Sequence, residues 1–252
     1  MPSPAEHRAE NARSTPSARD RDLRLLVHGA MGRMGQRIIA CAGQEPGHHV
    51  VLALDRDGEC ALRPGEIDAI VDFSSDEGAV RASALAAQLG TALLVGTTGL
   101  SAATRDSIAR NAVGVPAMIA PNTSLGVAVT RRLVEEAARL LPGFDIDIVE
   151  THHTRKLDAP SGTARSLAEA VGRGLQRPLD SSRIHAIRAG DVVGDHEVVF
   201  SGAGERVTIA HRATSRDLFA LGALRMARWL AGQAPGMHTA DEWFADFART
   251  GV

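Results

Sequence analysis

One segment of the chain collects several side chains that can donate protons or bind anions. It runs from Glu150 to Thr163 and reads ETHHTRKLDAPSGT. His152 and His153 can exchange protons near neutral pH, because the unperturbed pKa of histidine is about 6.5. Lys156 offers an ammonium that can orient a carboxylate or stabilise developing negative charge. We therefore predict that this segment belongs to an enzyme active site.

Lys156 is also the only lysine of the chain. The 252 residues include 28 lysines and arginines, so the other 27 are arginine. Coding bias explains a general preference for arginine, but it does not explain the one position that kept lysine. A compact ammonium and a planar guanidinium are not interchangeable where a point charge is needed. The composition therefore favours a specific role for Lys156, with chance placement as the alternative.

The end of the same segment has the features of an anion-binding helix start. Ser161 stands at an N-cap position, where its side chain can accept a backbone hydrogen bond. Gly162 and Thr163 follow in the first turn, where backbone amides lack partners within the helix. A carboxylate or phosphate binds well to such amides. We predict that Ser161, Gly162 and Thr163 bind a substrate anion; plain helix capping is the alternative.

A second candidate site is the glycine-rich turn GAMGRMG at residues 29–35. It follows the apolar run 23–27, which is typical of a buried strand, and it precedes a predicted helix. Glycines let the backbone approach a pyrophosphate, and the helix start supplies amide donors. Asp55 closes the next predicted strand, where it can bind an adenosine ribose, while Arg56 can meet a 2′-phosphate. The spacing departs from GxGxxG because Met31 occupies the second glycine position.

This pattern predicts NADH or NADPH as the cofactor. The loops 96–99 and 120–123 follow other predicted strands and carry threonines and an asparagine. Ligands of parallel sheets bind outside the carboxyl ends of the strands, so these loops can contact the nicotinamide end. Turns without a ligand are the alternative for each loop. The predicted cofactor-binding residues are Gly29, Ala30, Met31, Gly32, Arg33, Met34, Asp55, Arg56, Gly96, Thr97, Thr98, Ala120, Pro121, Asn122 and Thr123.

The order of the predicted elements gives the fold class. In the first half, strands are expected at 23–27, 50–54, 69–73, 92–95 and 116–120, and helices at 34–42, 77–89 and 102–111. Such alternation is typical of a doubly wound, Rossmann-type α/β fold with a parallel sheet. The later elements are helices at 127–141, 164–175 and 217–232, a strand at 144–150 and short strands within 184–212. Consecutive strands without helices between them indicate a second, α+β domain with a mixed sheet.

Composition limits the partners of the protein. The net charge is −2 and the aromatic fraction is 3%, so neither a basic stripe nor a base-stacking surface for nucleic acid is expected. No apolar run reaches the length of a membrane span. Cys41 and Cys60 have no metal-ligand spacing, and the histidine pair lacks a third ligand nearby, so no metal is predicted. So few cysteines favour a cytoplasmic setting, and residues 1–22 are expected to be a disordered extension.

The motifs described above identify a family resemblance. The sequence from Glu150 to Ala164 closely resembles the signature of the 4-hydroxy-tetrahydrodipicolinate reductase (dihydrodipicolinate reductase) family of lysine biosynthesis. The loops at 29–35, 72–75, 96–99 and 120–126 resemble the cofactor loops of that family. The segments 188–194 and 204–216 resemble its substrate-domain strands and the return to the first domain. The resemblance covers nearly the whole chain after residue 22.

The resemblance implies roles for the site residues. His152 would be the general acid, and Lys156 a second donor to the substrate. His153, Gly162 and Thr163 would bind a carboxylate of a small dicarboxylate substrate. It also implies a homotetramer built through the second sheet. The implied domains are a dinucleotide-binding domain at 23–122 and 217–252 and a substrate-binding and oligomerisation domain at 123–216.

Three features depart from the family pattern. Met31 replaces a frequent glycine, Thr123 stands where phenylalanine is usual, and residues 56–71 form a shorter connection than usual. We expect a helix or strand to be missing there. Two other functions stay open: another NAD(P)-dependent imine or amino-acid dehydrogenase, and a non-catalytic dinucleotide-binding regulator. The regulator would not require His152 and Lys156 together.

Overall fold

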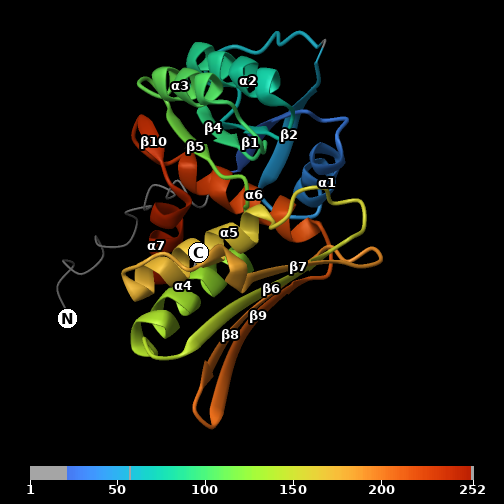
Figure 1. Cartoon of the computed structure of the whole chain (residues 1–252). Coiled ribbons are helices and arrows are strands. Elements are labelled where there is room, and N and C mark those ends of the chain that lie inside the picture. Colours follow the sequence, from blue (N-terminus) through green and yellow to red (C-terminus); the bar gives the residue numbers. More distant parts are fainter. Residues whose placement is uncertain (1–21, 57, 251–252) are drawn as a thin grey trace, which may run out of the picture.

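The computed structural model of the chain describes residues 22–56 and 58–250 (Figure 1). The predicted extension at 1–22 lies outside the described residues, apart from Asp22. The described residues form one six-stranded and one four-stranded sheet. This arrangement confirms the predicted fold class, a Rossmann-type parallel sheet followed by a mixed sheet.

The first sheet is parallel and has the strand order β10-β5-β4-β3-β1-β2. Its strands are β1 (Leu23–His28), β2 (His48–Leu54), β3 (Ala69–Asp72), β4 (Ala92–Val95), β5 (Pro116–Ile119) and β10 (Gly236–His238). The central strands β3 and β4 are buried along their whole length. They consist of apolar runs because helices cover both faces of the sheet.

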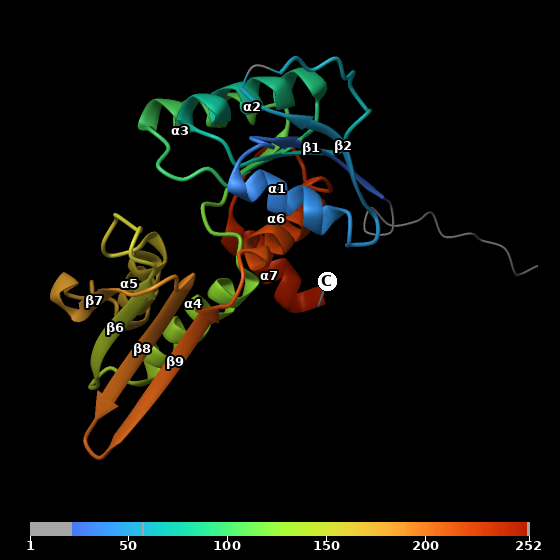
Figure 2. The same ribbon diagram turned by 90° about the vertical axis from the view of Figure 1, so that its right-hand side faces the viewer.

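Helices pack on both faces of this sheet (Figures 1 and 2). One core cluster joins it to α1 (Arg33–Ala42), α6 (Asp217–Leu230) and α7 (Ala240–Thr250). A second cluster joins it to α2 (Asp76–Leu89) and α3 (Ala102–Asn111). The sequence analysis did not predict α7 or β10. Within the described residues, no helix is long and apolar enough to cross a membrane.

The second sheet has the order β7-β6-β8-β9 and carries the predicted catalytic segment. Its strands are β6 (Asp145–His152), β7 (Ile184–Arg188), β8 (Gly194–Gly202) and β9 (Glu205–Ala213). α4 (Leu125–Leu140) and α5 (Gly162–Leu175) pack on one face. β6 runs two residues beyond its predicted end. Its alternating burial therefore places Glu150 and His152 on the helix-covered face.

The chain passes between the two sheets at residues 120–124 and returns at 214–216. These crossings lie close together, because Thr123 packs directly against α6. The Thr123 hydroxyl donates to the Phe219 carbonyl at 2.6 Å. A Cβ at Gly222 would lie 1.7 Å from the Thr123 carbonyl oxygen, so only glycine allows this approach. The predicted domain boundaries fall in these segments, although the division into domains stays a prediction.

The connection between β2 and β3 is as short as the sequence suggested. Its described residues, 55–56 and 58–68, contain no helix or strand. β1 pairs with β2 on one side and with β3 on the other, all in parallel. The edge of the sheet beside Asp55 therefore has no covering helix from this connection.

Candidate active site

The glycine-rich turn fits a pyrophosphate. Gly29 has a φ of +79°, a left-handed conformation that favours glycine. α1 then begins after Gly32, and no side chain caps it. By contrast, serine side chains cap α2, α3, α4 and α5. The first amides of α1 therefore lack acceptors among the described residues, as an anion-binding helix start requires.

Asp55 lies beside this turn at the end of β2. Its carboxylate accepts hydrogen bonds from the amides of Met31 and Arg56, both at 2.8 Å. The Arg56 amide, followed by that of Met31, lowers the pKa of Asp55. The carboxylate is thus ionised and can accept hydrogen bonds from ribose hydroxyls. The structure brings the predicted residues 29–34, Asp55 and Arg56 together at one edge of the sheet.

A buried carboxylate, that of Asp72, holds the predicted cofactor loops after β3 and β4 together. Asp72 is fully buried and accepts hydrogen bonds from the hydroxyls of Ser74, at 2.5 Å, and Thr97, at 2.6 Å. His28 Nδ1 lies 2.7 Å from the same carboxylate. The Thr97 hydroxyl also accepts from the Ser74 amide at 2.8 Å. Thr97 was predicted to bind the cofactor, but its hydroxyl is engaged in holding neighbouring loops together.

Neighbouring side chains of the 120–123 loop point in different directions. Ala120 is buried and its amide donates to the Val95 carbonyl at 2.8 Å, which extends the sheet pairing. The side chain of Thr123 is buried against α6, so it does not lie on the open edge of the sheet. Asn122 points the other way, and its Nδ2 donates to Thr163 Oγ1 at 2.9 Å. A predicted cofactor residue thus contacts a predicted substrate residue.

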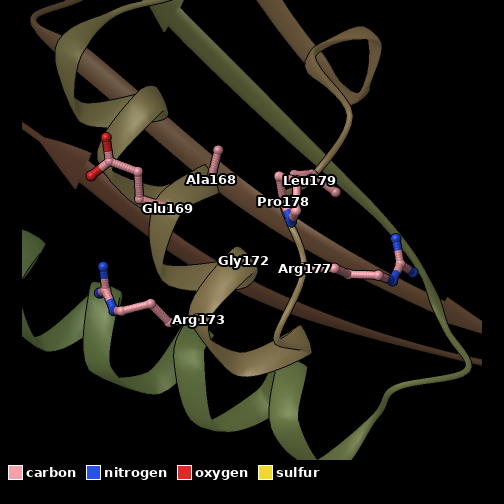
Figure 3. A pocket seen from close by; sticks show the side chains of 7 residues that line it. All are labelled: Ala168, Glu169, Gly172, Arg173, Arg177, Pro178 and Leu179. Atoms are coloured by element: carbon pink, nitrogen blue, oxygen red, sulfur yellow. The ribbon is translucent and has the colours of Figure 1, made fainter.

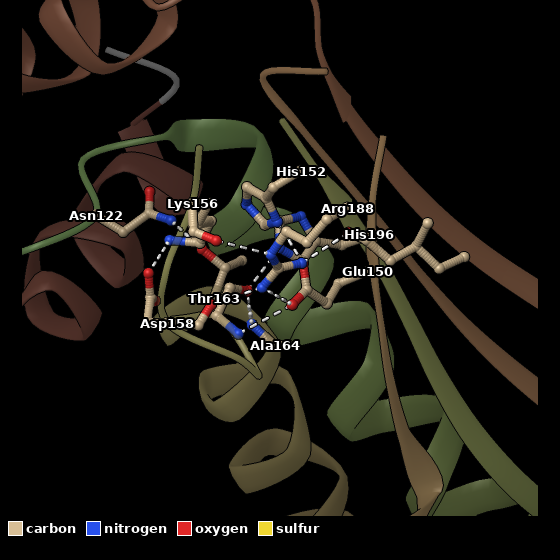
Figure 4. Close-up of polar contacts among 11 residues, drawn as sticks. Asn122, Glu150, His152, Lys156, Asp158, Thr163, Ala164, Arg188 and His196 are labelled. Carbon is tan, nitrogen blue, oxygen red and sulfur yellow. Dashed lines mark hydrogen bonds and ion pairs between the residues drawn. The ribbon is translucent and has the colours of Figure 1, made fainter. Parts of the chain in front are cut away.

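The predicted acid, His152, is held by a buried carboxylate that the sequence analysis did not single out. Glu150 is fully buried, and its Oε2 lies in close contact with His152 Nδ1 (Figure 4). Its Oε1 accepts from the Ser161 amide at 3.1 Å. Burial would raise the pKa of Glu150, but hydrogen bonds from Arg188, His152 and Ser161 outweigh burial and lower it. The ionised carboxylate therefore fixes the orientation of the imidazole ring.

Arg188 joins this carboxylate to the loop that carries the lysine. Its Nη1 and Nη2 donate to the two oxygens of Glu150 at 3.1 and 3.0 Å. Its Nε donates to the Lys156 carbonyl at 3.2 Å, and Nη2 to the Asp158 carbonyl at 2.6 Å. The planar fork of arginine suits such multiple contacts. One guanidinium thus fixes the backbone on both sides of Leu157.

The ammonium of Lys156 is paired within its own loop. Lys156 Nζ lies 2.8 Å from Asp158 Oδ1, and the Lys156 side chain is 23% exposed. The hydrogen bond from Lys156 lowers the pKa of Asp158. A substrate carboxylate would meet an ammonium that is already oriented but still reachable from solvent.

The start of α5 combines capping with open amides. The Ser161 hydroxyl accepts from the Ala164 amide at 3.1 Å and lies 3.2 Å from His196 Nε2. Ser161 is buried, so its side chain acts as a cap and does not face the open site. The amides of Gly162 and Thr163 have no acceptor among the described residues. These two amides therefore remain the predicted anion-binding element.

Two further histidines line the site. His196 is buried, and its ring lies edge-on to that of His152 with centroids 5.1 Å apart. Burial, then the nearby charge of His152, lowers the pKa of His196 to about 4, so His196 is neutral at pH 7. Burial and the charge of Arg155 lower the pKa of His153. His153 Nδ1 and His196 Nδ1 are buried without a hydrogen-bond partner among the described residues.

Glu150, His152 and His196 are close enough together to hold a metal ion. Their donor atoms are, however, largely engaged. Arg188 contacts both oxygens of Glu150, and the Ser161 hydroxyl lies beside His196 Nε2. A guanidinium at this position repels a cation. The absence of a metal therefore stays our prediction.

A separate open cavity lies in the second half of the chain (Figure 3). It has a volume of about 560 Å³ and lies between α5 and residues 177–179. None of the predicted site residues lines it. The active-site candidate is therefore the cluster around Glu150 and not this cavity.

Comparisons with known proteins match both halves of the chain to one family. The family model "Dihydrodipicolinate reductase, N-terminus" matches residues 23–123, and "Dihydrodipicolinate reductase, C-terminus" matches residues 126–244. A 4-hydroxy-tetrahydrodipicolinate reductase of Stenotrophomonas maltophilia is 46% identical over 86% of this chain and 95% of its own length. One from Myxococcus xanthus is 39% identical over 86% of this chain and 95% of its own length.

Solved structures share the fold. A dipicolinate-bound dihydrodipicolinate reductase from Paenisporosarcina sp. TG-14 has a TM-score of 0.70 and 21% identity, covering 86% of this chain and 97% of its own. The Corynebacterium glutamicum diaminopimelate dehydrogenase, named "C. glutamicum DAP dehydrogenase", has a TM-score of 0.55 and 12% identity, covering 92% of this chain and 99% of its own. At these identities the likeness shows the fold alone. The two family models together span the described chain from β1 into α7, and on that basis the chain belongs to the dihydrodipicolinate reductase family.

Proposed function

We propose that this chain reduces 4-hydroxy-tetrahydrodipicolinate to tetrahydrodipicolinate with NADH or NADPH, on the route to lysine and meso-diaminopimelate. The names of its relatives support this reaction. The observation that carries the proposal is the Glu150 carboxylate. It joins the predicted acid, His152, to the anion-binding start of α5, and through Arg188 to the Lys156 loop.

His152 is the proton donor in this proposal. Because Glu150 occupies Nδ1, the proton for the substrate comes from Nε2. A Cβ on Gly194 would lie only 3.0 Å from that Nε2, so the glycine leaves room beside the donating atom. Hydride addition to an unsaturated carbon leaves negative charge on the substrate, which a nearby acid must neutralise. Neutral His196 packs against the ring without adding a competing positive charge.

The substrate carboxylates are bound by the start of α5 and the cations beside it. The amides of Gly162 and Thr163 and the side chain of His153 hold one carboxylate. Lys156 exchanges part of its contact with Asp158 for the substrate. Ser161 acts through its cap on α5 and does not contact the substrate itself.

The nicotinamide cofactor supplies the hydride when bound. Residues 29–34 hold its pyrophosphate at the start of α1, and Asp55 accepts from the adenosine ribose. Arg56 can meet a 2′-phosphate. Asp55 therefore suits the ribose of NADH, and Arg56 suits the 2′-phosphate of NADPH. The backbone of the loops at 96–98 and 120–123 lies toward the nicotinamide in this proposal, while the side chains of Thr97 and Thr123 face inward.

The proposed assembly is a cytoplasmic homotetramer. The face of the second sheet away from α4 and α5 is uncovered in one protomer (Figure 2). Ile187 pairs with Thr151 on that sheet and is 47% exposed. An exposed apolar side chain on an open sheet face suits an interface between copies. The free cysteines Cys41 and Cys60 are consistent with a reducing compartment.

The reaction is tested directly with enzymatically generated substrate. The purified chain should oxidise NADH or NADPH only when this substrate is present, and a comparison of the two cofactors gives the preference. An amino-acid dehydrogenase would instead reduce NAD(P)⁺ with an amino acid. Cofactor binding without turnover of either kind would favour the regulator and reject the proposal.

Replacing the acid should separate chemistry from cofactor binding. His152→Ala should lower kcat about 10²–10⁴-fold, the usual contribution of a general acid. Its Kd for NADH, measured by fluorescence titration, should stay within about twofold, because His152 ends a strand of the second sheet, whereas α1 packs on the first. Equal losses of kcat and of NADH affinity would assign His152 a structural role.

The charge of Glu150 should matter for catalysis beyond its size. Glu150→Gln keeps the shape and one acceptor for the Ser161 amide, but it no longer favours a proton on His152 Nδ1. We expect kcat to fall at least about tenfold with a smaller change in KM, as with other groups that orient a catalytic histidine. Thermal unfolding should be recorded in parallel. A folded variant with wild-type kcat would contradict the orienting role.

Lys156→Arg keeps the positive charge but changes its shape. The guanidinium cannot act as a compact point charge between Asp158 and the substrate. We expect at least about a tenfold loss of kcat/KM for the substrate, with NADH affinity unchanged. Near-wild-type turnover would show that any cation suffices at this position.

A further inference from the structure

Asn122 lies where the two binding regions meet. It follows β5 at the carboxyl edge of the first sheet, where we predicted contact with the cofactor. Its side chain nevertheless reaches the first turn of α5 and contacts Thr163 (Figure 4). Thr123, the next residue, is buried against α6. Asn122 therefore extends toward the predicted substrate site from a backbone that the buried Thr123 holds against α6.

The hydrogen bonds of Asn122 fix the direction of its amide group. Asn122 Oδ1 lies 3.0 Å from the Ser124 amide. A backbone N–H can only donate, so the oxygen must face it. The NH₂ group must then face Thr163, where Nδ2 lies 2.9 Å from Oγ1. Ser124 also caps α4, with Oγ 3.2 Å from the Val127 amide. The residue whose amide donates to Asn122 is therefore itself held in place.

This direction determines what the Thr163 hydroxyl can do. A hydroxyl has one proton to donate and two lone pairs that accept. Because Asn122 presents only donors, Thr163 Oγ1 must accept from it. The hydroxyl proton is then left to donate elsewhere. An ionised carboxylate can only accept, so the arrangement matches the anionic substrate of the proposed reaction.

We infer that Asn122 is a positioning residue for the substrate, which acts by making the Thr163 hydroxyl a donor to a substrate carboxylate. This inference rests on the proposed function and assigns to Asn122 a task other than holding the cofactor. Because Asn122 follows β5 at the carboxyl edge of the first sheet, its hydrogen bond to Thr163 also links the two predicted binding regions.

A double-mutant cycle tests whether Asn122 acts through Thr163. Asn122→Ser keeps a hydroxyl for the Ser124 amide but is too short to reach Thr163. Thr163→Val removes the hydroxyl and keeps the shape. Both variants and their combination are titrated with dipicolinate, a planar dicarboxylate, by calorimetry in the presence of NADH. NADH alone is titrated by fluorescence.

Each single variant should raise the Kd for dipicolinate about tenfold, the scale of one weakened hydrogen bond to a charged group. The double variant should match Thr163→Val within about twofold, because Asn122 has no target once the hydroxyl is gone. The Kd for NADH should change less than about twofold. The substrate KM should follow the dipicolinate Kd.

Asn111→Ser is the matched control. Asn111 Nδ2 donates to Ser83 Oγ at 2.9 Å, the same kind of bond between α3 and α2. This variant should change the melting temperature as much as Asn122→Ser does, but leave dipicolinate binding unchanged. An equal loss of binding in the control would show that the effect is one of general stability, and would overturn the inference.

Two other outcomes would also overturn it. Losses that multiply to about 100-fold in the double variant would show that the two residues act independently. A tenfold weaker NADH affinity of Asn122→Ser with unchanged dipicolinate binding would assign Asn122 to cofactor binding, as first predicted. The wild-type assay keeps the two proposals apart: an inactive wild type rejects the proposed reaction, whereas an active wild type with an additive cycle rejects only the role of Asn122.

Discussion

The site depends on one buried charge, the carboxylate of Glu150. Burying an ion inside a protein costs roughly several kcal/mol of free energy, unless nearby hydrogen bonds and opposite charges compensate for the lost water. Here the compensating donors come from three elements: His152 on β6, Arg188 on β7 and the Ser161 amide at α5. Losing any one donor would leave part of the buried charge without compensation, so each donor is held in place. The same requirement that stabilises the carboxylate therefore fixes the predicted acid, the lysine loop and the predicted anion-binding helix start relative to one another.

The two predicted binding regions use helix starts in different ways. α1 has no side-chain cap, so its first amides are left for a cofactor pyrophosphate. α5 has the Ser161 cap, yet Gly162 and Thr163 still offer amides because one hydroxyl cannot satisfy the whole first turn. The fully buried Asp72 supports the loops of the first region in the way Glu150 supports the second. Both regions thus place a buried carboxylate behind groups that are predicted to face a ligand.

Local sequence patterns were sufficient to predict much of the fold and to select candidate site residues, whose roles stay predictions. The strand at 92–95 and the helix at 102–111 have the predicted bounds, because their apolar patterns and flanking turn residues are local signals. Arg188 and His196 could not be predicted as partners of the acid. They reach it only because β6 pairs His152 with Arg188 and Glu150 with His196, and strand register is a tertiary property. Thr97 and Thr123 looked like ligand contacts, but tertiary hydrogen bonds direct their side chains inward.

Under the proposed function, the contrast between Arg188 and Lys156 gives a physical reason why a chain so rich in arginine keeps one lysine. Arg188 has a structural task that needs several donors in one plane, and its three nitrogens contact Glu150 and two loop carbonyls. Such a side chain cannot move toward a substrate without breaking the site. Lys156 has one carboxylate partner, Asp158, at a partly exposed position. An ammonium on a flexible stem can shift between that partner and a substrate while keeping its charge. Arg188 positions the loop, and in the proposed reaction the movable ammonium of Lys156 is left to meet the ligand.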